Sequence, residues 1–289
     1  MAPVNAPEHH ATSTRPRTVR WVIAATVVAA LAAGTAGIIA ATRGGDDAPE
    51  PAATATAAAA DSPAPTPTPA STASAAPGAL DVGEVILTAG EGGIALYDAP
   101  GDGEPAESLG RWSLYGSPLT LMGFAEATVD DERWVEVELV GAPNHRRAWV
   151  READASVSST DVAIHVFLEE RELEVMQGDE SAMRTTVVVG AEESPTPLGT
   201  FWITDPLDFS ANPTGVYGAY ALGLNGYSEV LEEFNGGPPQ VAIHGTNDES
   251  VLGKAVSNGC IRLANEDVLA VAELAPIGTP VIVHASRDV

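Results

Sequence analysis

From Val82 to the C-terminal region, short apolar runs alternate with turns rich in Gly, Pro and Asp. Residues 134–139 show the pattern most clearly, because apolar residues alternate there with glutamates, which is the period of a strand with one buried face. We expect further strands at residues 85–87, 94–97, 118–121, 148–150, 162–168, 173–176, 185–190, 201–203, 241–243 and 281–283. The chain is therefore predicted to be mainly β.

A single helix is expected near the end of the chain. Asn265 is a predicted N-cap, and the next two residues, both acidic, suit the positive end of a helix dipole. The apolar run stops at Pro276, which ends a helix of this kind.

The N-terminal part is predicted to cross a membrane. The 21 residues from Trp21 to Ala41 carry no charge, and a helix of that length spans roughly 31 Å, enough for a hydrocarbon core. Arginines precede the apolar run, so residues 1–20 are expected to be a cytoplasmic tail and the rest of the chain to be exported. A cleaved signal peptide is the alternative, because small residues near Ala32 suit its cleavage site.

Residues 42–79 are predicted to be a disordered linker. They are rich in Ala, Pro, Thr and Ser, a composition that favours an extended spacer over a packed core.

The net charge of −26 repels nucleic acid and anionic lipid headgroups, so neither is expected as a partner of the exported part. No metal-ligand spacing, phosphate loop or nucleotide motif occurs in the sequence, and no cofactor is expected.

Cys260 is the only cysteine, so it cannot form a disulfide within the chain. It is either a buried small residue, a link to another chain, or a reactive thiol. It follows Ser257-Asn258-Gly259, a turn whose backbone N–H groups suit an oxyanion. His244 ends an apolar run upstream and is the candidate base. A reactive thiolate requires that His244 and Arg262 lower the thiol pKa against the acidic net charge.

These motifs resemble the L,D-transpeptidase catalytic domain family. The resemblance is carried by His244-Gly245-Thr246 and by Ser257-Asn258-Gly259-Cys260-Ile261-Arg262. Two further markers agree, the segments 194–201 and 278–281. The family usually has His where this chain has Asn258. The resemblance covers residues 160–285 and implies a β-sandwich with a short helix after the cysteine loop.

The resemblance also implies an activity: the formation of 3→3 cross-links between peptidoglycan stem peptides through an acyl-enzyme. Cys260 is then the nucleophile and His244 the base, oriented by the carbonyl of Gly245. The N–H groups of Gly259 and Cys260 are the expected oxyanion donors. Ser257 shapes the loop, as any turn hydroxyl would.

Three further residues are candidates for substrate binding. Arg262 is expected to bind a substrate carboxylate or to lower the thiol pKa, with a salt bridge to Glu266 or Asp267 as the alternative. Asn258 can donate a hydrogen bond, although it cannot shuttle a proton. Tyr217 lies in a Gly-rich stretch and is expected to line a lid over the cleft or to pack in the fold.

Residues 80–157 resemble bacterial SH3-like domains, on the strength of the run 96–101 and the later Trp149-Val150. Such a small β-barrel would contact the cell wall or serve as a spacer.

Two alternatives to the transpeptidase stay open: an L,D-carboxypeptidase that uses water as acceptor, and a wall-binding protein with an impaired site. Carbapenem-type inhibitors are expected to acylate Cys260 in an active enzyme.

Overall fold

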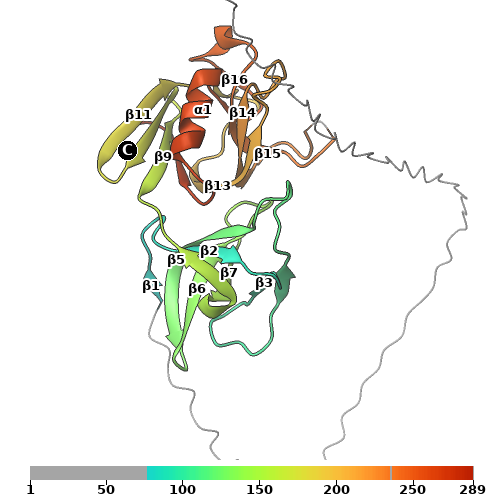
Figure 1. Cartoon of the computed structure of the whole chain (residues 1–289), viewed down its shortest axis with the longest axis vertical. Helices are drawn as coiled ribbons and strands as arrows, with labels where there is room; N and C mark the ends of the chain where they lie inside the picture. The colour runs from blue at the N-terminus through green and yellow to red at the C-terminus, as the bar shows by residue number, and fades with distance from the viewer. Residues whose placement is uncertain (1–76, 235, 289) are drawn as a thin grey trace, which may run out of the picture. The chain divides into compact units, whose positions relative to one another are not determined.

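The computed structural model describes residues 77–234 and 236–288, which belong to one compact unit (Figure 1). The predicted cytoplasmic tail, the membrane anchor and nearly all of the predicted linker lie outside these residues. Within the described ranges, no helix combines the length and the apolar character needed to span a bilayer.

Residues 78–158 form a first β domain. Its six-stranded sheet has the order β7-β6-β5-β2-β8, with β1 paired to β5, and β3 pairs with β4 separately. The strands are β1 Gly78–Ala79, β2 Ile86–Ala89, β3 Ile94–Leu96, β4 Glu107–Leu109, β5 Thr120–Val129, β6 Glu132–Glu138, β7 Arg147–Arg151 and β8 Ala155–Ser158. Val135 and Val137 of β6 are fully buried, as the alternation predicted. The resemblance of this domain to SH3-like barrels stays a prediction.

Residues 162–284 form a second β domain around an eight-stranded sheet, in the order β11-β10-β9-β18-β13-β14-β15-β17. Its strands are β9 Val162–Phe167, β10 Glu172–Gln177, β11 Glu180–Thr186, β13 Gly199–Asp208, β14 Tyr220–Tyr227, β15 Gln240–His244, β17 Ile261–Arg262 and β18 Pro280–His284. Two short strands, β12 Val189–Gly190 and β16 Ala255–Ser257, pair in parallel beside it.

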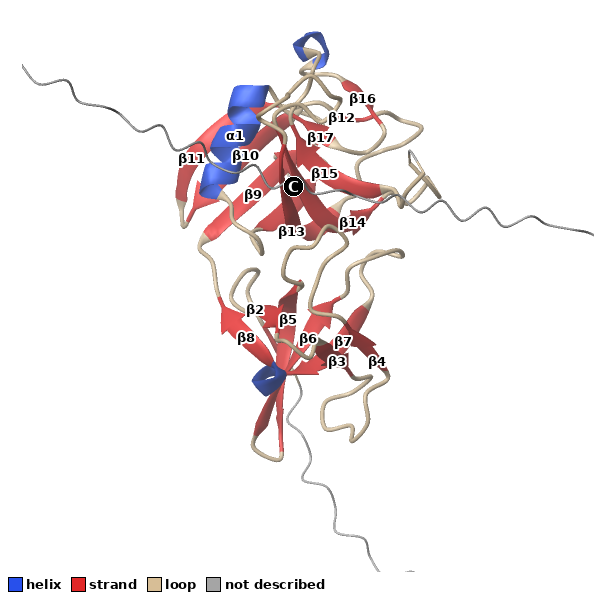
Figure 2. Cartoon of the chain, turned by 45° about the vertical axis from the view of Figure 1, so that its right-hand side comes forward, coloured by secondary structure: helices blue, strands red, loops and turns tan. Residues whose placement is uncertain are grey.

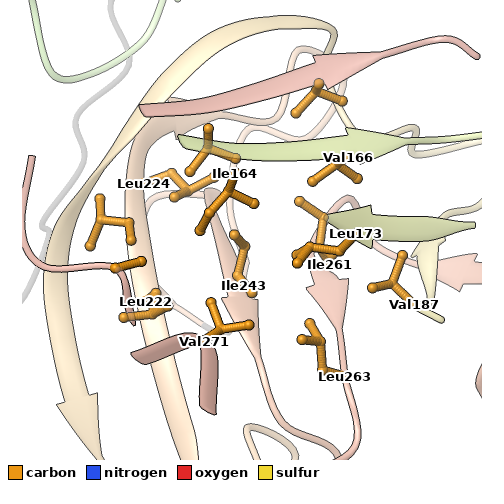
Figure 3. Packing of buried hydrophobic residues seen from close by; sticks show 14 of the residues in the cluster. Ile164, Val166, Leu173, Val187, Leu222, Leu224, Ile243, Ile261, Leu263 and Val271 are labelled. Carbon is orange, nitrogen blue, oxygen red and sulfur yellow. The ribbon is translucent and has the colours of Figure 1, made fainter. Parts of the chain in front are cut away.

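Strand β13 joins the two halves of this sheet. Its first residues, 199–202, pair with β18, whereas residues 203 and 205–208 pair with β14, with a register shift between Ile203 and Asp205. Such an irregularity bends a strand and turns its sheet. Ile164 of β9 and Leu224 of β14 come from the two halves and share one buried cluster (Figure 3). The second domain is therefore a sandwich-like β fold, as expected.

Helix α1, Asn265–Leu274, is the single α-helix among the described residues, and Figure 2 shows it in blue beside the red strands. Val268 and Val271 are its fully buried residues and join the same cluster. The prediction that Asn265 caps the helix is wrong. Ala264 holds the N-cap position without a side-chain bond, and the side chain of Asn265 is used elsewhere.

Two strand predictions also need correction. The expected strand at residues 185–190 is split, because Val188 leaves the hairpin and pairs with Arg262 instead. The eight-residue strand β14, Tyr220–Tyr227, is missing from the strands expected from the sequence. Glycine weakens strand propensity in general, but here a Cβ on Gly226 would lie 2.4 Å from the Phe201 ring, so the strand has no room for a side chain.

Candidate active site

The cysteine loop connects β16 to β17 and turns at Gly259, which has a φ of +106° that favours glycine. The hydroxyl of Ser257 closes the turn: it donates to the carbonyl of Cys260 at 2.6 Å and accepts from the Gly259 N–H at 3.2 Å. The expectation that the Gly259 N–H serves as an oxyanion donor is therefore not met in this structure, because Ser257 already binds it. The N–H of Cys260 stays a predicted donor.

A second segment, residues 190–196, is hydrogen-bonded to this loop. The Thr196 hydroxyl accepts from the Gly190 N–H at 2.9 Å and donates to the Gly259 carbonyl, also at 2.9 Å. The Ser194 hydroxyl donates to the carbonyl of Ser257 at 3.2 Å. Sequence analysis used residues 194–201 as a family marker but gave Ser194 and Thr196 no role at the site.

His244 stands at the end of β15, and the residue is only 3% exposed. Its Nδ1 lies 2.6 Å from the carbonyl oxygen of Gly245. A carbonyl only accepts, so Nδ1 carries the proton and Nε2 of the neutral ring keeps its lone pair. Burial, assisted by the positive charge of Arg262, lowers the pKa of His244 to about 4 although the Gly245 carbonyl opposes the change. At neutral pH His244 is thus an uncharged potential base.

The Cys260 thiol and His244 line the same cavity, which has a volume of about 390 Å³. Tyr217 also lines it and stands edge-on to the imidazole, with ring centroids 5.1 Å apart. Tyr217 stacks on Phe209 as well, at 6.1 Å between centroids. The structure thus brings Tyr217 to the site, where it covers one edge of His244.

The thiol itself is not held as a thiolate. Burial raises the pKa of Cys260, and this effect outweighs the Ala242 backbone N–H and the charge of Arg262, both of which lower it. Arg262 lowers the thiol pKa as expected, but the expected net lowering is wrong because the effect of burial is larger. A nucleophilic Cys260 would therefore pass its proton to a base during attack instead of before it.

Arg262 lines the cavity with Cys260 and His244. The alternative of a salt bridge to Glu266 or Asp267 is not seen in the described part of the chain, where Asp267 instead accepts from Thr185 Oγ1 at 2.6 Å. The Nε of Arg262 is buried without a hydrogen-bond partner. A buried guanidinium nitrogen without a partner favours an anionic ligand.

Asn258 is exposed and lines the same cavity from the turn that precedes Cys260. Within residues 77–234 and 236–288, no group of three metal-ligating side chains comes together. All the predicted site residues therefore lie in or directly beside the cysteine cavity.

Comparison with known proteins gives this arrangement a family. Residues 161–283 match the model of the L,D-transpeptidase catalytic domain. The match covers 123 of the 289 residues, and residues 161–283 are called the transpeptidase domain below. Its sequence is 38% identical over 118 residues to the YkuD protein of Bacillus licheniformis, which is named as an L,D-transpeptidase, with 41% of this chain and 62% of the relative covered. The Bacillus subtilis YkuD protein is 38% identical over 98 residues, 34% of this chain and 51% of its own length.

The chain thus spans between half and two thirds of the length of these relatives. Among solved structures, L,D-transpeptidase 3 from Mycobacterium tuberculosis, in complex with a faropenem-derived adduct, aligns with a TM-score of 0.36 and 15% identity. That alignment covers 53% of this chain and 91% of the other.

Asn265 is the residue of the transpeptidase domain that sequence reasoning placed incorrectly. Its Oδ1 accepts from the Ala219 N–H at 2.7 Å, and its Nδ2 donates to the carbonyl of Thr246 at 2.9 Å. It thereby joins the segment of Tyr217 to the turn of His244. The signal in the sequence was an amide next to a helix start, which is equally typical of a cap.

Proposed function

We propose that this chain is a cell-wall L,D-transpeptidase that forms 3→3 cross-links between peptidoglycan stem peptides. One observation carries the proposal: the Cys260 thiol and the uncharged, backbone-oriented imidazole of His244 line a single cavity. A neutral base and a protonated thiol that line one cavity are a pair from which proton transfer and nucleophilic attack can proceed together. The family of residues 161–283 agrees with this chemistry.

In the proposed acylation step, Cys260 Sγ attacks the carbonyl carbon of residue three in a donor tetrapeptide while His244 Nε2 takes the thiol proton. The tetrahedral intermediate places its negative oxygen near the Cys260 N–H. The C–N bond to the terminal D-alanine then breaks, and the imidazolium returns the proton to the leaving amine. A thioester and free D-alanine result.

In the second step, an amine on residue three of a neighbouring stem attacks the thioester. His244 accepts a proton from that amine, the C–S bond breaks, and the proton returns to the sulfur. The products are the cross-linked peptide and the starting thiol. Water in place of the amine would give an L,D-carboxypeptidase with the same residues.

Arg262 is the proposed binding residue for the terminal carboxylate of the donor. Its unpartnered Nε and its place in the cavity beside Cys260 support this role. Asn258 and Tyr217 line the same cavity and are proposed to contact the peptide around the attacked carbonyl.

The location of the enzyme is part of the proposal. The uncharged residues 21–41, preceded by arginines, support a single membrane anchor with a cytoplasmic N-terminus and an extracytoplasmic transpeptidase domain. Membrane fractionation with external protease tests this arrangement: digestion of residues 77–288 in intact spheroplasts is the expected result. Full protection would contradict it.

Acylation by a carbapenem tests the chemistry. Intact-mass measurement should show one adduct on the wild-type protein, none on Cys260→Ala, and much slower formation on His244→Ala. A wild-type protein that forms no adduct would favour a wall-binding protein with an impaired site. Product analysis on purified muropeptides then separates the two enzymes, because tripeptides without any dimer would indicate the carboxypeptidase.

A further inference from the structure

A second cavity of about 380 Å³ also reaches Cys260, and one of its walls comes from outside the transpeptidase domain. That wall is Tyr115, in the segment of the first β domain that connects β4 to β5. Tyr115 is 52% exposed, so its ring is accessible to a ligand in the cavity. The other walls include Phe209 and Tyr217.

The segment that carries Tyr115 is held in place by hydrogen bonds. The Ser113 hydroxyl donates to the carboxylate of Asp205, a residue of β13 that is only 1% exposed. The same hydroxyl accepts from the Ser117 N–H at 3.0 Å, and the Ser113 N–H donates to the Ser117 carbonyl at 2.9 Å. A turn that is closed on itself and bound to a buried strand presents Tyr115 in a defined position.

The two cavities differ in chemistry. The first contains Arg262, whereas the described residues that line the second carry no charged side chain. Cys260 lines both, so the attacked carbonyl must lie where they meet. If Arg262 binds the terminal carboxylate on the leaving side, the acyl side of the donor extends into the second cavity.

We propose that Tyr115 is a specificity-determining residue, which packs against the first two residues of the donor stem and favours stems that are uncharged there. The inference rests on the proposed function. It gives the first β domain a direct part in substrate binding. A domain that served only as a spacer would not place a side chain in the cavity that Cys260 lines. An aromatic face contributes apolar contact and little else, so it discriminates against a carboxylate that would lose its water.

Equilibrium binding tests the inference without catalysis. In the full-length Cys260→Ala protein, isothermal titration would compare two tetrapeptides that share residues three and four, one with aliphatic residues one and two, the other with acidic ones. The Tyr115→Ala change should weaken binding of the aliphatic peptide about fivefold to tenfold, which is the usual value of one aromatic contact, and leave the acidic peptide unchanged. Tyr115→Phe should bind like the parent.

Leu114→Ala is the matched control, because Leu114 is 61% exposed on the same turn and lines neither cavity. Equal Kd values for Tyr115→Ala and Leu114→Ala, or equal weakening of both peptides, would overturn the inference. The carbapenem adduct separates this failure from that of the proposed function. An adduct on the wild type with no effect of Tyr115 refutes only the role of Tyr115, whereas the absence of an adduct refutes the enzyme.

Discussion

The carbonyl oxygen of Gly245 accepts a hydrogen bond from Nδ1 of His244 at 2.6 Å, and this contact between neighbouring residues sets the tautomer of the imidazole. In many enzymes a carboxylate orients the histidine and stabilises its charged form. A neutral carbonyl stabilises the imidazolium much less. The pair therefore works from the uncharged state, and its dependence on pH should reveal that.

The rate of acylation by a carbapenem should stay nearly constant between pH 7 and pH 5. The folded-state pKa of His244 is lowered to about 4, so the base loses its lone pair only as the pH falls through that value. A histidine with the ordinary pKa of about 6.5 would lose roughly eightfold in rate between pH 7 and pH 5.5. Intact-mass time courses at fixed inhibitor concentration measure the rate, and such an eightfold loss would contradict the buried neutral imidazole.

Asn265→Ala should slow acylation by tenfold or more and also lower the melting temperature, because the buried Ala219 N–H and Thr246 carbonyl lose their partner. The change removes both hydrogen bonds that tie the Tyr217 segment to the His244 turn. Asn265→Asp keeps the acceptor for the Ala219 N–H but loses the donor to Thr246, so its rate should be intermediate. Asp267→Asn is the control on the same helical turn, since Asp267 contacts Thr185 and lines neither cavity. Equal acylation rates in Asn265→Ala and Asp267→Asn would show that Asn265 does not position the site.

The sequence was sufficient to predict the chemical groups of the site, but not their environment. Cys260 and His244 were identified because a lone thiol after a glycine turn, with a histidine a short distance upstream, is typical of a nucleophile and its base. The raised thiol pKa was missed because it comes from burial, which depends on the folded cavity. The sequence shows only the net charge and the charged residues that are near in the chain. Only the neighbours of the thiol in space decide which of these effects prevails.

The fold shows the same division between local and long-range information. Strand β6 was predicted because its alternation is local. Strand β14 was missed because its Gly226 fits against Phe201, a residue of another strand. Asn265 was assigned to a cap for the same reason, since its partners Ala219 and Thr246 are distant in the chain.

Thr196→Val should destabilise the protein and also slow acylation. Thr196 is 3% exposed, and its hydroxyl bridges the Gly190 N–H and the Gly259 carbonyl. Valine has a similar shape but leaves both groups unpaired, at a cost of about 1–3 kcal/mol. Urea unfolding measures the cost. Thr120→Val is the comparison, because it removes a buried hydroxyl bonded to Pro118 and should leave the acylation rate unchanged. Unchanged acylation in Thr196→Val would mean that the loop keeps its shape without this bridge.

Trp202 should be the residue whose loss most destabilises both β domains together. It belongs to β13 of the transpeptidase domain, yet it is fully buried in a cluster with Leu87 and Leu121 of the first domain. Its Nε1 donates to the Thr120 carbonyl at 2.9 Å. Trp202→Ala should therefore lower the free energy of unfolding by about 3–5 kcal/mol, and Trp202→Phe by less because only part of the packing and the one hydrogen bond are lost.

Trp112→Ala, a change at a tryptophan that is 55% exposed, is the control for Trp202 and should shift stability by no more than about 0.5 kcal/mol. Differential scanning calorimetry of residues 77–289 would show one cooperative transition in the parent protein. It should show two separate transitions in Trp202→Ala, because the two domains then share less buried surface. A single transition at the parental temperature in Trp202→Ala would mean that the domains unfold independently of this contact. The position of Tyr115 in the second cavity would then depend on the Ser113–Asp205 bond alone.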